Sequence, residues 1–410
     1  MKKWIIFVGI IPALLFGFLH VRNARKQYLK TETYIKFLKK EVYLSKLHSP
    51  IRGWMKEQIE DDFSEYQSKG FGLKQVEATY AQVKRYSPMF VRYRIINKQL
   101  YRYFPDGESI SLQDNTTERA IKTILQCTSL PDMDFVISYF DGITLQDRYF
   151  DDLTADLQAP VFFPAKVEGV PHVVLIPDWR SIGEWWISDI KSIQKRVGLF
   201  SWNQKKNFAL WRGSLTKPIR RKLCELSLHY PEYLDAKFFN LEYPKEEDLQ
   251  YLGDRVSWEE FLECKYLPLM DGVVCAAPAF QWRLLSYSVI FKHDSNEIQW
   301  FYRPLKPYLH YVPVKADLSN LIEQFNWAKE HDNECKEMAE KAALFAKENL
   351  MYEDVLEYFT RVLLRYSSLQ KNQDPIIVGN GWVNIQKRES MRVKAKKENF
   401  KGYTIHPTPY

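Results

Sequence analysis

Residues 131–142 read PDMDFVISYFDG, and this stretch decides the fold class of the chain. The apolar run from Phe135 to Tyr139 has the length and composition of a buried strand, and Asp141 and Gly142 follow its carboxyl end. Open α/β sheets bind their ligands beyond the carboxyl ends of the strands, so Asp141 is well placed for acid–base chemistry. The alternative interpretation is an Asp-Gly turn that only closes the strand.

Short apolar runs recur on both sides of this strand at helix-sized intervals. Further strands are expected at Val161–Phe163, Val173–Ile176, Ala209–Trp211 and Ser288–Phe291. Helices are expected from near Thr116 or Thr117, from a cap at Ser319, and from Tyr352. This alternation predicts an α/β fold rather than a β-sandwich.

A second candidate functional segment is ALWRGSLTKPIRR, residues 209–221, in which a strand ends at an Arg-Gly-Ser turn before a basic helix. Phosphate recognition needs backbone N–H groups at a helix start, a glycine for close approach and a nearby cation. Arg212 offers a bidentate fork, Gly213 allows close approach, and the hydroxyls of Ser214 and Thr216 can donate. The pattern therefore indicates a phosphate-binding loop, although Arg-Gly-Ser also occurs in plain turns.

Two later segments add candidates for the same ligand. Residues 264–292 are expected to form an exposed turn, a helix and a buried strand; Arg283 is a candidate second phosphate cation and Trp282 a candidate stacking surface. Burial on a helix face is the alternative for Trp282. A proline-rich loop at residues 300–318 carries His310, which is either a ligand contact or a hydrogen-bonded structural histidine.

Composition excludes several classes of protein. The chain has 410 residues, enough for two domains, and its 46% hydrophobic and 27% charged residues exclude a disordered chain. The net charge of +7 suits an anionic partner, but no nucleic-acid-binding motif accompanies it, so no nucleic-acid partner is expected. The five cysteines are scattered, which predicts small buried residues rather than a metal cage or a complete disulfide framework.

Metal ligands are not expected either. Asp132 and Asp134 form a D-x-D pair, but the pair precedes its strand instead of following it, where its carboxylates would face a ligand.

The two ends of the chain differ from its middle. An uncharged run from Trp4 to Leu19, followed by basic residues, predicts an uncleaved membrane anchor over residues 1–22, with a removed signal peptide as the alternative. The downstream basic charge favours a membrane-associated protein whose catalytic part is cytoplasmic; a secretory lumen is the alternative. Residues 371–410 form a polar, basic tail that is either solvated or in contact with a membrane surface.

Taken together, four patterns resemble glycosyltransferase family 90, over roughly Leu130 to Arg365. They are P-D-M-D-F-V-I-x-x-x-D, W-R-G-S-x-T, C-K-Y and L-K-P-Y-x-H-Y-V-P-V-K-x-D-L-S. The family contains lipopolysaccharide- and capsule-modifying transferases and protein O-glucosyl- and O-xylosyltransferases. By this resemblance Asp141 matches the catalytic base, and Arg212, Gly213, Ser214 and Thr216 match the loop that holds the donor diphosphate.

The resemblance implies a GT-B-like fold, two Rossmann-like domains facing a cleft, with a helical N-terminal extension. The acceptor-side domain is then expected at residues 23–190, the donor domain at 191–350 and a closing helix at 351–370. It also implies an inverting, metal-independent transfer without a cofactor, from a nucleotide-sugar donor, expected to carry uridine diphosphate.

The acceptor is expected to be a hydroxyl of a lipopolysaccharide or capsule glycan at the membrane. A protein Ser or Thr hydroxyl is the alternative, and an inactive sugar- or nucleotide-binding relative is a third interpretation. Two positions depart from the protein-glucosylating members. Phe140 stands where they have Arg, and their second phosphate-binding Arg falls in a register that here crosses Ala279, Gln281 and Arg283.

Overall fold

The computed structural model of the chain describes residues 33–104, 111–154, 156–239, 245–276, 278–372 and 374–386. The predicted anchor at residues 1–22 and the basic part of the tail from Lys387 onward lie outside these ranges. Within them, no helix has both the length and the apolar character that crossing a bilayer requires.

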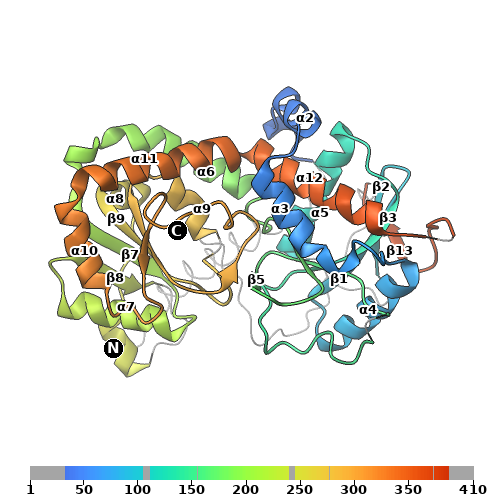
Figure 1. Cartoon of the computed structure of the whole chain (residues 1–410), viewed down its shortest axis with the longest axis horizontal. Coiled ribbons are helices and arrows are strands. Elements are labelled where there is room, and N and C mark those ends of the chain that lie inside the picture. The colour runs from blue at the N-terminus through green and yellow to red at the C-terminus, as the bar shows by residue number, and fades with distance from the viewer. Residues whose placement is uncertain are drawn as a thin grey trace, which may run out of the picture.

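A six-stranded mixed sheet forms the core of one half of the molecule, on the right in Figure 1, in the order β13-β2-β1-β3-β4-β6. Its strands are β1 (Phe90–Ile96), β2 (Gln99–Tyr103), β3 (Met133–Ser138), β4 (Val161–Phe163), β6 (Val173–Leu175) and β13 (Trp382–Asn384). β3, β4 and β6 run parallel, while β1 is antiparallel to both β2 and β3. The expected strand before Asp141 is β3, and all six of its residues are buried.

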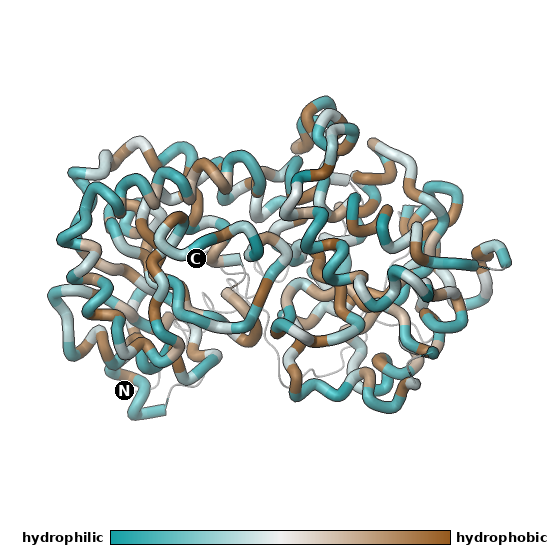
Figure 2. The backbone as a smooth tube through the Cα atoms, viewed as in Figure 1, coloured by the Kyte–Doolittle hydropathy of each residue, from teal (hydrophilic) through white to brown (hydrophobic). Residues whose placement is uncertain are grey.

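The helices of this half come from both ends of the chain. They are α2 (Lys40–His48), α3 (Gly53–Asp62), α4 (Leu73–Tyr86), α5 (Leu112–Cys127) and the last described helix, α12 (Tyr352–Leu369). The short 3₁₀ turns of both halves are η1 (Ile35–Phe37), η2 (Ser64–Tyr66), η3 (Val197–Leu199), η4 (Trp202–Gln204) and η5 (Glu246–Tyr251). In Figure 2 the outer helices alternate between teal and brown, as expected when one helix face is buried.

A five-stranded, wholly parallel sheet forms the core of the other half. It consists of β7 (Lys206–Gly213), β8 (Leu234–Phe238), β9 (Cys264–Leu269), β10 (Val289–His293) and β12 (Val312–Val314) in the order β12-β10-β9-β7-β8. The strand order reverses between β7 and β9, which is the topological switch point of a doubly wound α/β sheet. The described chain is thus a mixed α/β fold with parallel strands in both halves.

The helices of this second half are α6 (Glu184–Arg196), which packs against α8 and α9, then α7 (Pro218–His229), α8 (Trp258–Leu262), α9 (Ala279–Leu284), α10 (Leu321–Glu330) and α11 (Asp332–Asn349). A two-stranded antiparallel ladder joins the halves, pairing β5 (Lys166–Val167) with β11 (Glu297–Ile298). The larger apolar core also contains residues of both halves, such as Phe162 and Ile290.

Three expected elements differ from the observed ones. The exposed turn expected from residue 264 is the central strand β9, whose six residues are all buried. The helix expected from Thr116 or Thr117 starts at Leu112, because the hydroxyl of Ser111 accepts the Asp114 N–H while the Asp114 carboxylate accepts the Ser111 N–H. The tract expected from Ser319 is two helices that break at His331, and the first is preceded by Asn320.

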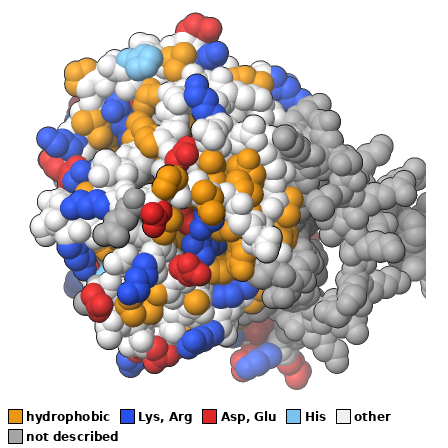
Figure 3. All heavy atoms as spheres, turned by 90° about the vertical axis from the view of Figure 1, so that its right-hand side faces the viewer, with side chains coloured by type: hydrophobic (Ala, Val, Ile, Leu, Met, Phe, Trp, Pro, Cys, Tyr) orange, Lys and Arg blue, Asp and Glu red, His pale blue; other side chains and the backbone are white. Residues whose placement is uncertain are grey.

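The first part of the predicted tail also folds. β13 adds an edge strand to β2, and the ring of Trp382 lies 4.2 Å from the Arg94 guanidinium. Arg94 in turn donates to the Ile377 carbonyl at 2.7 Å. Figure 3 views this end of the molecule, where hydrophobic, acidic and basic side chains are interspersed and neither sign of charge dominates.

Candidate functional site

Asp141 lies beyond the carboxyl end of β3, as predicted, and the glycine after it fixes its surroundings. A Cβ added to Gly142 would lie 2.7 Å from Val274 Cβ and 2.9 Å from the Ala165 carbonyl oxygen, so only glycine fits there. Val274 belongs to the loop that follows β9 in the other half. Close packing at Gly142 therefore brings Asp141 to the junction of the two halves.

The Asp141 side chain is exposed, yet its electrostatic surroundings are unusual. The protein packed around it raises the pKa of its carboxyl, the negative charge of Asp178 raises it further, and Arg180 opposes the rise. A carboxyl that is open to solvent while its charged form is disfavoured suits proton transfer.

Asp178 and Arg180 follow β6, two strands away from β3 in the same parallel set. The Asp178 carboxylate is buried and accepts the backbone N–H groups of Arg180 at 2.9 Å and Ser181 at 3.2 Å. The sequence interpretation did not include this loop. The signal that could have found it is an Asp directly after a short apolar strand, the same pattern that singled out Asp141.

The loop predicted to bind phosphate lies at the switch point of the parallel sheet. Arg212 and Gly213 end β7, and Ser214 and Thr216 lead into α7. A Cβ on Gly213 would collide with the Trp211 ring, so a larger residue would displace this turn. Arg212 donates to the Asp235 carboxylate at 2.6 Å and to the carbonyls of Trp211, Asp235 and Asp254.

Arg220 of α7 connects this loop to the neighbouring strand. Its guanidinium donates to the Ser214 carbonyl at 3.0 Å, to that of Asp271 at 2.8 Å and to that of Met270 at 3.1 Å. Burial lowers its pKa to about 10, so it is still charged at neutral pH. One cation thus holds together the two strand ends that flank the switch point, a role that sequence reasoning missed.

Further ionisable groups gather beyond β9 and β10. The Ser295 hydroxyl donates to the Asp271 carboxylate at 2.6 Å, and His293 Nε2 lies 3.4 Å from the same group. Burial lowers the pKa of His293 to about 4 and raises that of Asp271. Glu297 pairs with Lys217 and accepts the Cys275 N–H at 2.6 Å. This cluster joins the phosphate-loop helix, the loop after β9 and the ladder between the halves.

The three other predicted ligand residues, Trp282, Arg283 and His310, are in contact with other groups of the protein. Trp282 is buried in α9, 5.2 Å from the Phe261 ring, which is the helix-face placement considered as its alternative. Arg283 is buried, donates to the Ala279 carbonyl at 3.1 Å and lies over the Trp282 ring. His310 Nδ1 accepts the Lys306 N–H at 3.0 Å, and burial lowers its pKa. A ligand role for each of them stays a prediction.

The D-x-D pair has other partners. Asp134 lies inside β3, where Arg92 binds it through two bonds of 2.8 Å and Arg94 through one of 2.6 Å. Asp132 accepts the Asn97 N–H at 2.8 Å. Among the described residues, no group of three or more Asp, Glu, His or Cys side chains could hold a metal ion. All five cysteines are free thiols.

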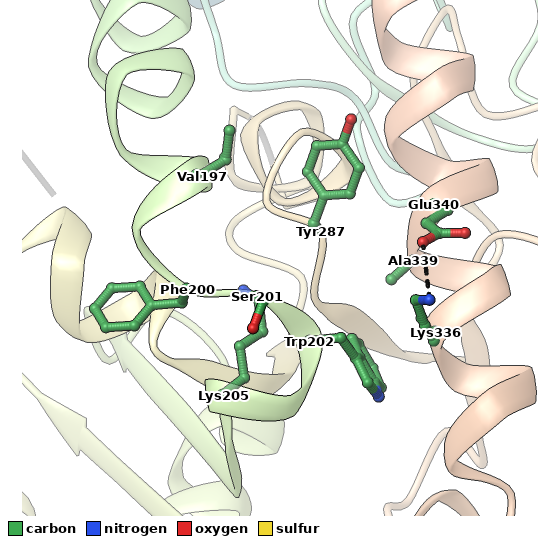
Figure 4. A pocket seen from close by; sticks show the side chains of 10 residues that line it. Val197, Phe200, Ser201, Trp202, Lys205, Tyr287, Lys336, Ala339 and Glu340 are labelled. Atoms are coloured by element: carbon green, nitrogen blue, oxygen red, sulfur yellow. Dashed lines mark ion pairs between the residues drawn. The ribbon is translucent and has the colours of Figure 1, made fainter.

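A pocket of about 320 Å³ lies at the opposite edge of the parallel sheet (Figure 4). Its walls come from the end of α6, the loop before β10 and α11, where Lys336 pairs with Glu340 at 3.8 Å. The buried Lys205 amine donates to the carbonyls of Leu262 and Ser286 and to the Ser288 hydroxyl, and burial lowers its pKa to about 8. These contacts precede β9 and β10, so this pocket is separate from the strand ends at Gly213.

Comparison with known proteins identifies the family to which the sequence is similar. The family model described as glycosyl transferase family 90 matches residues 54–403. Protein O-glucosyltransferase 2 of Danio rerio is 30% identical over 322 residues, covering 76% of this chain and 62% of that protein. Protein O-glucosyltransferase 3 of Homo sapiens is 27% identical over 347 residues, with 78% and 62% covered. Protein O-glucosyltransferase 1 of Homo sapiens is 28% identical over 256 residues, with 58% and 63% covered. The chain thus spans less than two thirds of the length of these relatives.

Proposed function

The chain belongs to glycosyltransferase family 90 and is a glycosyltransferase, and we propose that it transfers a sugar from a nucleotide diphosphate to a protein Ser or Thr hydroxyl. The relatives named above are protein O-glucosyltransferases, which favours the protein acceptor over the lipopolysaccharide or capsule glycan expected from the sequence. Transfer to a glycan but not to a protein would correct this proposal.

The observation that carries the proposal is the approach of Asp141 to the switch point. Gly142 packs against Val274, in the loop after β9, while β7 and β9 end side by side. A donor diphosphate at Gly213 and Ser214 would then lie on the side of the parallel sheet that faces Asp141. We propose that the two halves act as the acceptor and donor domains of a GT-B enzyme.

In this mechanism Asp141 accepts the proton of the acceptor hydroxyl as its oxygen attacks the anomeric carbon, with inversion of configuration. The C–O bond to the diphosphate breaks, and the leaving group carries its negative charge away. Backbone N–H groups at Gly213 and Ser214, with the cations of Arg212 and Lys217, would stabilise that charge without a metal ion.

The test is release of free nucleotide diphosphate from a panel of nucleotide sugars, with Ser- or Thr-bearing protein acceptors in one arm and glycans in the other. We expect uridine diphosphate sugars and protein acceptors to support turnover. Turnover with glycans alone would replace the acceptor class, and no transfer from any donor would contradict the enzymatic function.

Asp141→Asn tests the base itself. The change keeps the shape of the side chain but removes its ability to accept a proton, so we expect donor binding to persist and transfer to fall by about 10²–10⁴-fold. Asp151→Asn is the matched control, because Asp151 follows in the same loop and pairs with Arg148 at the surface. A parent-like rate for Asp141→Asn would show that another group takes the proton.

A further inference from the structure

Three aromatic rings continue directly from the proposed base. Phe140 precedes Asp141 in the chain and is partly exposed. Its ring stacks on that of Tyr149, with ring centres 5.7 Å apart and planes inclined by 15°. Tyr149 meets the Tyr86 ring edge-on, again with centres 5.7 Å apart. We refer to the rings of Phe140, Tyr149 and Tyr86 as the aromatic surface.

The fold holds the aromatic surface at the same edge of the sheet as Asp141. Because β1 is antiparallel to β3, the beginning of β1 lies at the carboxyl end of β3. α4 ends at Tyr86, shortly before β1 begins at Phe90. The buried Phe90 ring lies 5.6 Å from the Phe140 ring and 5.0 Å from the Tyr149 ring. The aromatic surface therefore rests on the core and has a fixed position.

Part of this region is open to solvent. Tyr86 is 47% exposed, and Leu145, in the loop that joins Asp141 to Tyr149, is 58% exposed. Large apolar side chains that gather at a protein surface mark sites of interaction with a ligand or a partner. Here they gather around a residue with a proposed catalytic role.

The position of the base identifies the occupant of the aromatic surface. For proton transfer, an acceptor hydroxyl has to come within about 2.6–3.2 Å of the Asp141 carboxylate. Phe140 is the chain neighbour of Asp141, with the two Cα atoms about 3.8 Å apart. The group that carries the hydroxyl must therefore pass close to the Phe140 ring, so the occupant is the acceptor.

The polar groups around the rings favour an apolar group of that acceptor over a sugar. Asp152 accepts the Gln82 amide at 3.0 Å and lies 3.5 Å from the Tyr86 hydroxyl. Asp147 accepts both the N–H and the hydroxyl of Thr144. A sugar ring buried here would have to break such bonds to satisfy its own hydroxyls, which costs free energy. An apolar side chain gains by covering aromatic rings and needs no hydrogen bond.

We propose that the aromatic surface binds an apolar side chain next to the acceptor Ser or Thr of a polypeptide, and so selects which hydroxyls reach Asp141. The inference rests on the proposed transfer to protein. The rings take no part in the chemical step and lie on the acceptor side, so they determine affinity for the acceptor and not for the donor.

The experiment compares two synthetic peptides that differ only in the residues on either side of a central Ser, which are Phe in one and Asn in the other. Their binding to the full chain is measured by calorimetry. We expect the parent to bind the Phe peptide about tenfold more tightly, and Tyr86→Ala to bind both equally. Tyr86→Phe keeps the ring and should keep the preference. Affinity for uridine diphosphate should be the same in all three proteins.

Tyr230→Ala is the matched control. Tyr230 follows the end of α7 as a 38% exposed aromatic residue, and it precedes β8, at the opposite edge of the parallel sheet from Gly213. This variant should keep the parent's preference. Tyr149→Ala should lose the preference as Tyr86→Ala does. If the loss of packing on Phe90 unfolds Tyr149→Ala, Tyr86→Ala decides alone, because its side chain is half exposed.

Equal affinities of the two peptides for the parent, no binding of either, or a preference that persists in Tyr86→Ala would overturn the inference. So would a glycan that binds in place of the peptides and is lost in Tyr86→Ala, because the surface would then serve a glycan acceptor. Peptide binding in the expected order without transfer from any donor would instead reject the proposed function. Transfer to proteins with equal peptide affinities would reject the inference alone, so the two failures are distinguishable.

Discussion

The guanidinium of Arg212 has its donors occupied by Asp235 and by backbone carbonyls of its own half. To bind a diphosphate, the fork has to exchange the Asp235 carboxylate for phosphate oxygens. That exchange is feasible because the Asp235 side chain is about one third exposed, at 32%, and can be hydrated when released. At the scale of single residues, Arg212 therefore has two possible roles. It either binds phosphate after releasing Asp235, or it serves only to hold β7 against β8.

Arg212→Ala distinguishes these roles. Hydrogen bonds to charged groups contribute about 1.5–3 kcal/mol, so loss of the fork should weaken donor binding by about 10- to 100-fold, measured by calorimetry with a nucleotide sugar. Arg212→Lys keeps the charge but not the bidentate geometry and should recover only part of the affinity. Parent-like affinity in the alanine variant, with a lowered melting temperature, would assign Arg212 to the pinning role.

The contacts of Asp134 lead to a second prediction for a single residue, which concerns metal dependence and stability. Since both of its oxygens are bound by Arg92 and Arg94, we expect turnover to be unaffected by a chelator. Asp134→Asn should instead cost about 3–5 kcal/mol of folding stability, because it leaves the buried Arg92 and the partly buried Arg94 without their counter-charge. Asp132→Asn is the control for stability. Activity that a chelator abolishes and manganese restores would bring this pair back as metal ligands.

At the scale of elements, β13 shows how a polar segment can still join the edge of a sheet. Its Trp382 ring covers Arg94 and lies 5.2 Å from the Tyr103 ring, so it shields the arginines that bind Asp134. Trp382→Ala removes a cation–π contact and buried area, and we expect thermal unfolding to show a loss of about 1–3 kcal/mol. Ile377→Ala, at a side chain 69% exposed, should change stability very little. Equal stability of both variants and the parent would mean that β13 adds nothing to the sheet.

The strands also show where sequence patterns are sufficient to predict an element and where they are not. β4, β6 and the central part of β3, Phe135–Ile137, are apolar runs buried on both faces, so their composition predicts them directly. β9 was missed because Lys265 and Pro268 interrupt its apolar pattern. In the structure Lys265 is neutralised by Asp332 at 2.6 Å and lies 4.8 Å from the Trp202 ring, contacts that no local pattern reveals.

At the scale of the whole molecule, the residues near the candidate site differ in how far the sequence predicts them. Asp141 and the Arg212 loop could be placed from sequence because each follows a recognisable strand, and strand ends of α/β sheets collect functional groups. Asp178 follows a short apolar strand as Asp141 does and could have been found in the same way, whereas the role of Arg220 depends on which strands are neighbours. Contacts such as that of Gly142 with Val274 join residues more than a hundred positions apart and follow only from the assembled fold.

The position of α12 affects the order in which the two halves fold during translation. This helix is formed by residues near the end of the described chain, yet it packs against α2, α3 and α5, and its Tyr366 hydroxyl donates to the Asp134 carbonyl inside β3. During synthesis the ribosome releases the six-stranded half first, but that half lacks a central part of its core until α12 emerges. The parallel-sheet half, made later, has all its strands available earlier. We therefore expect the usual order of folding from the N-terminus to be reversed here, with nascent chains exposing the apolar face of β3 to chaperones until α12 has emerged.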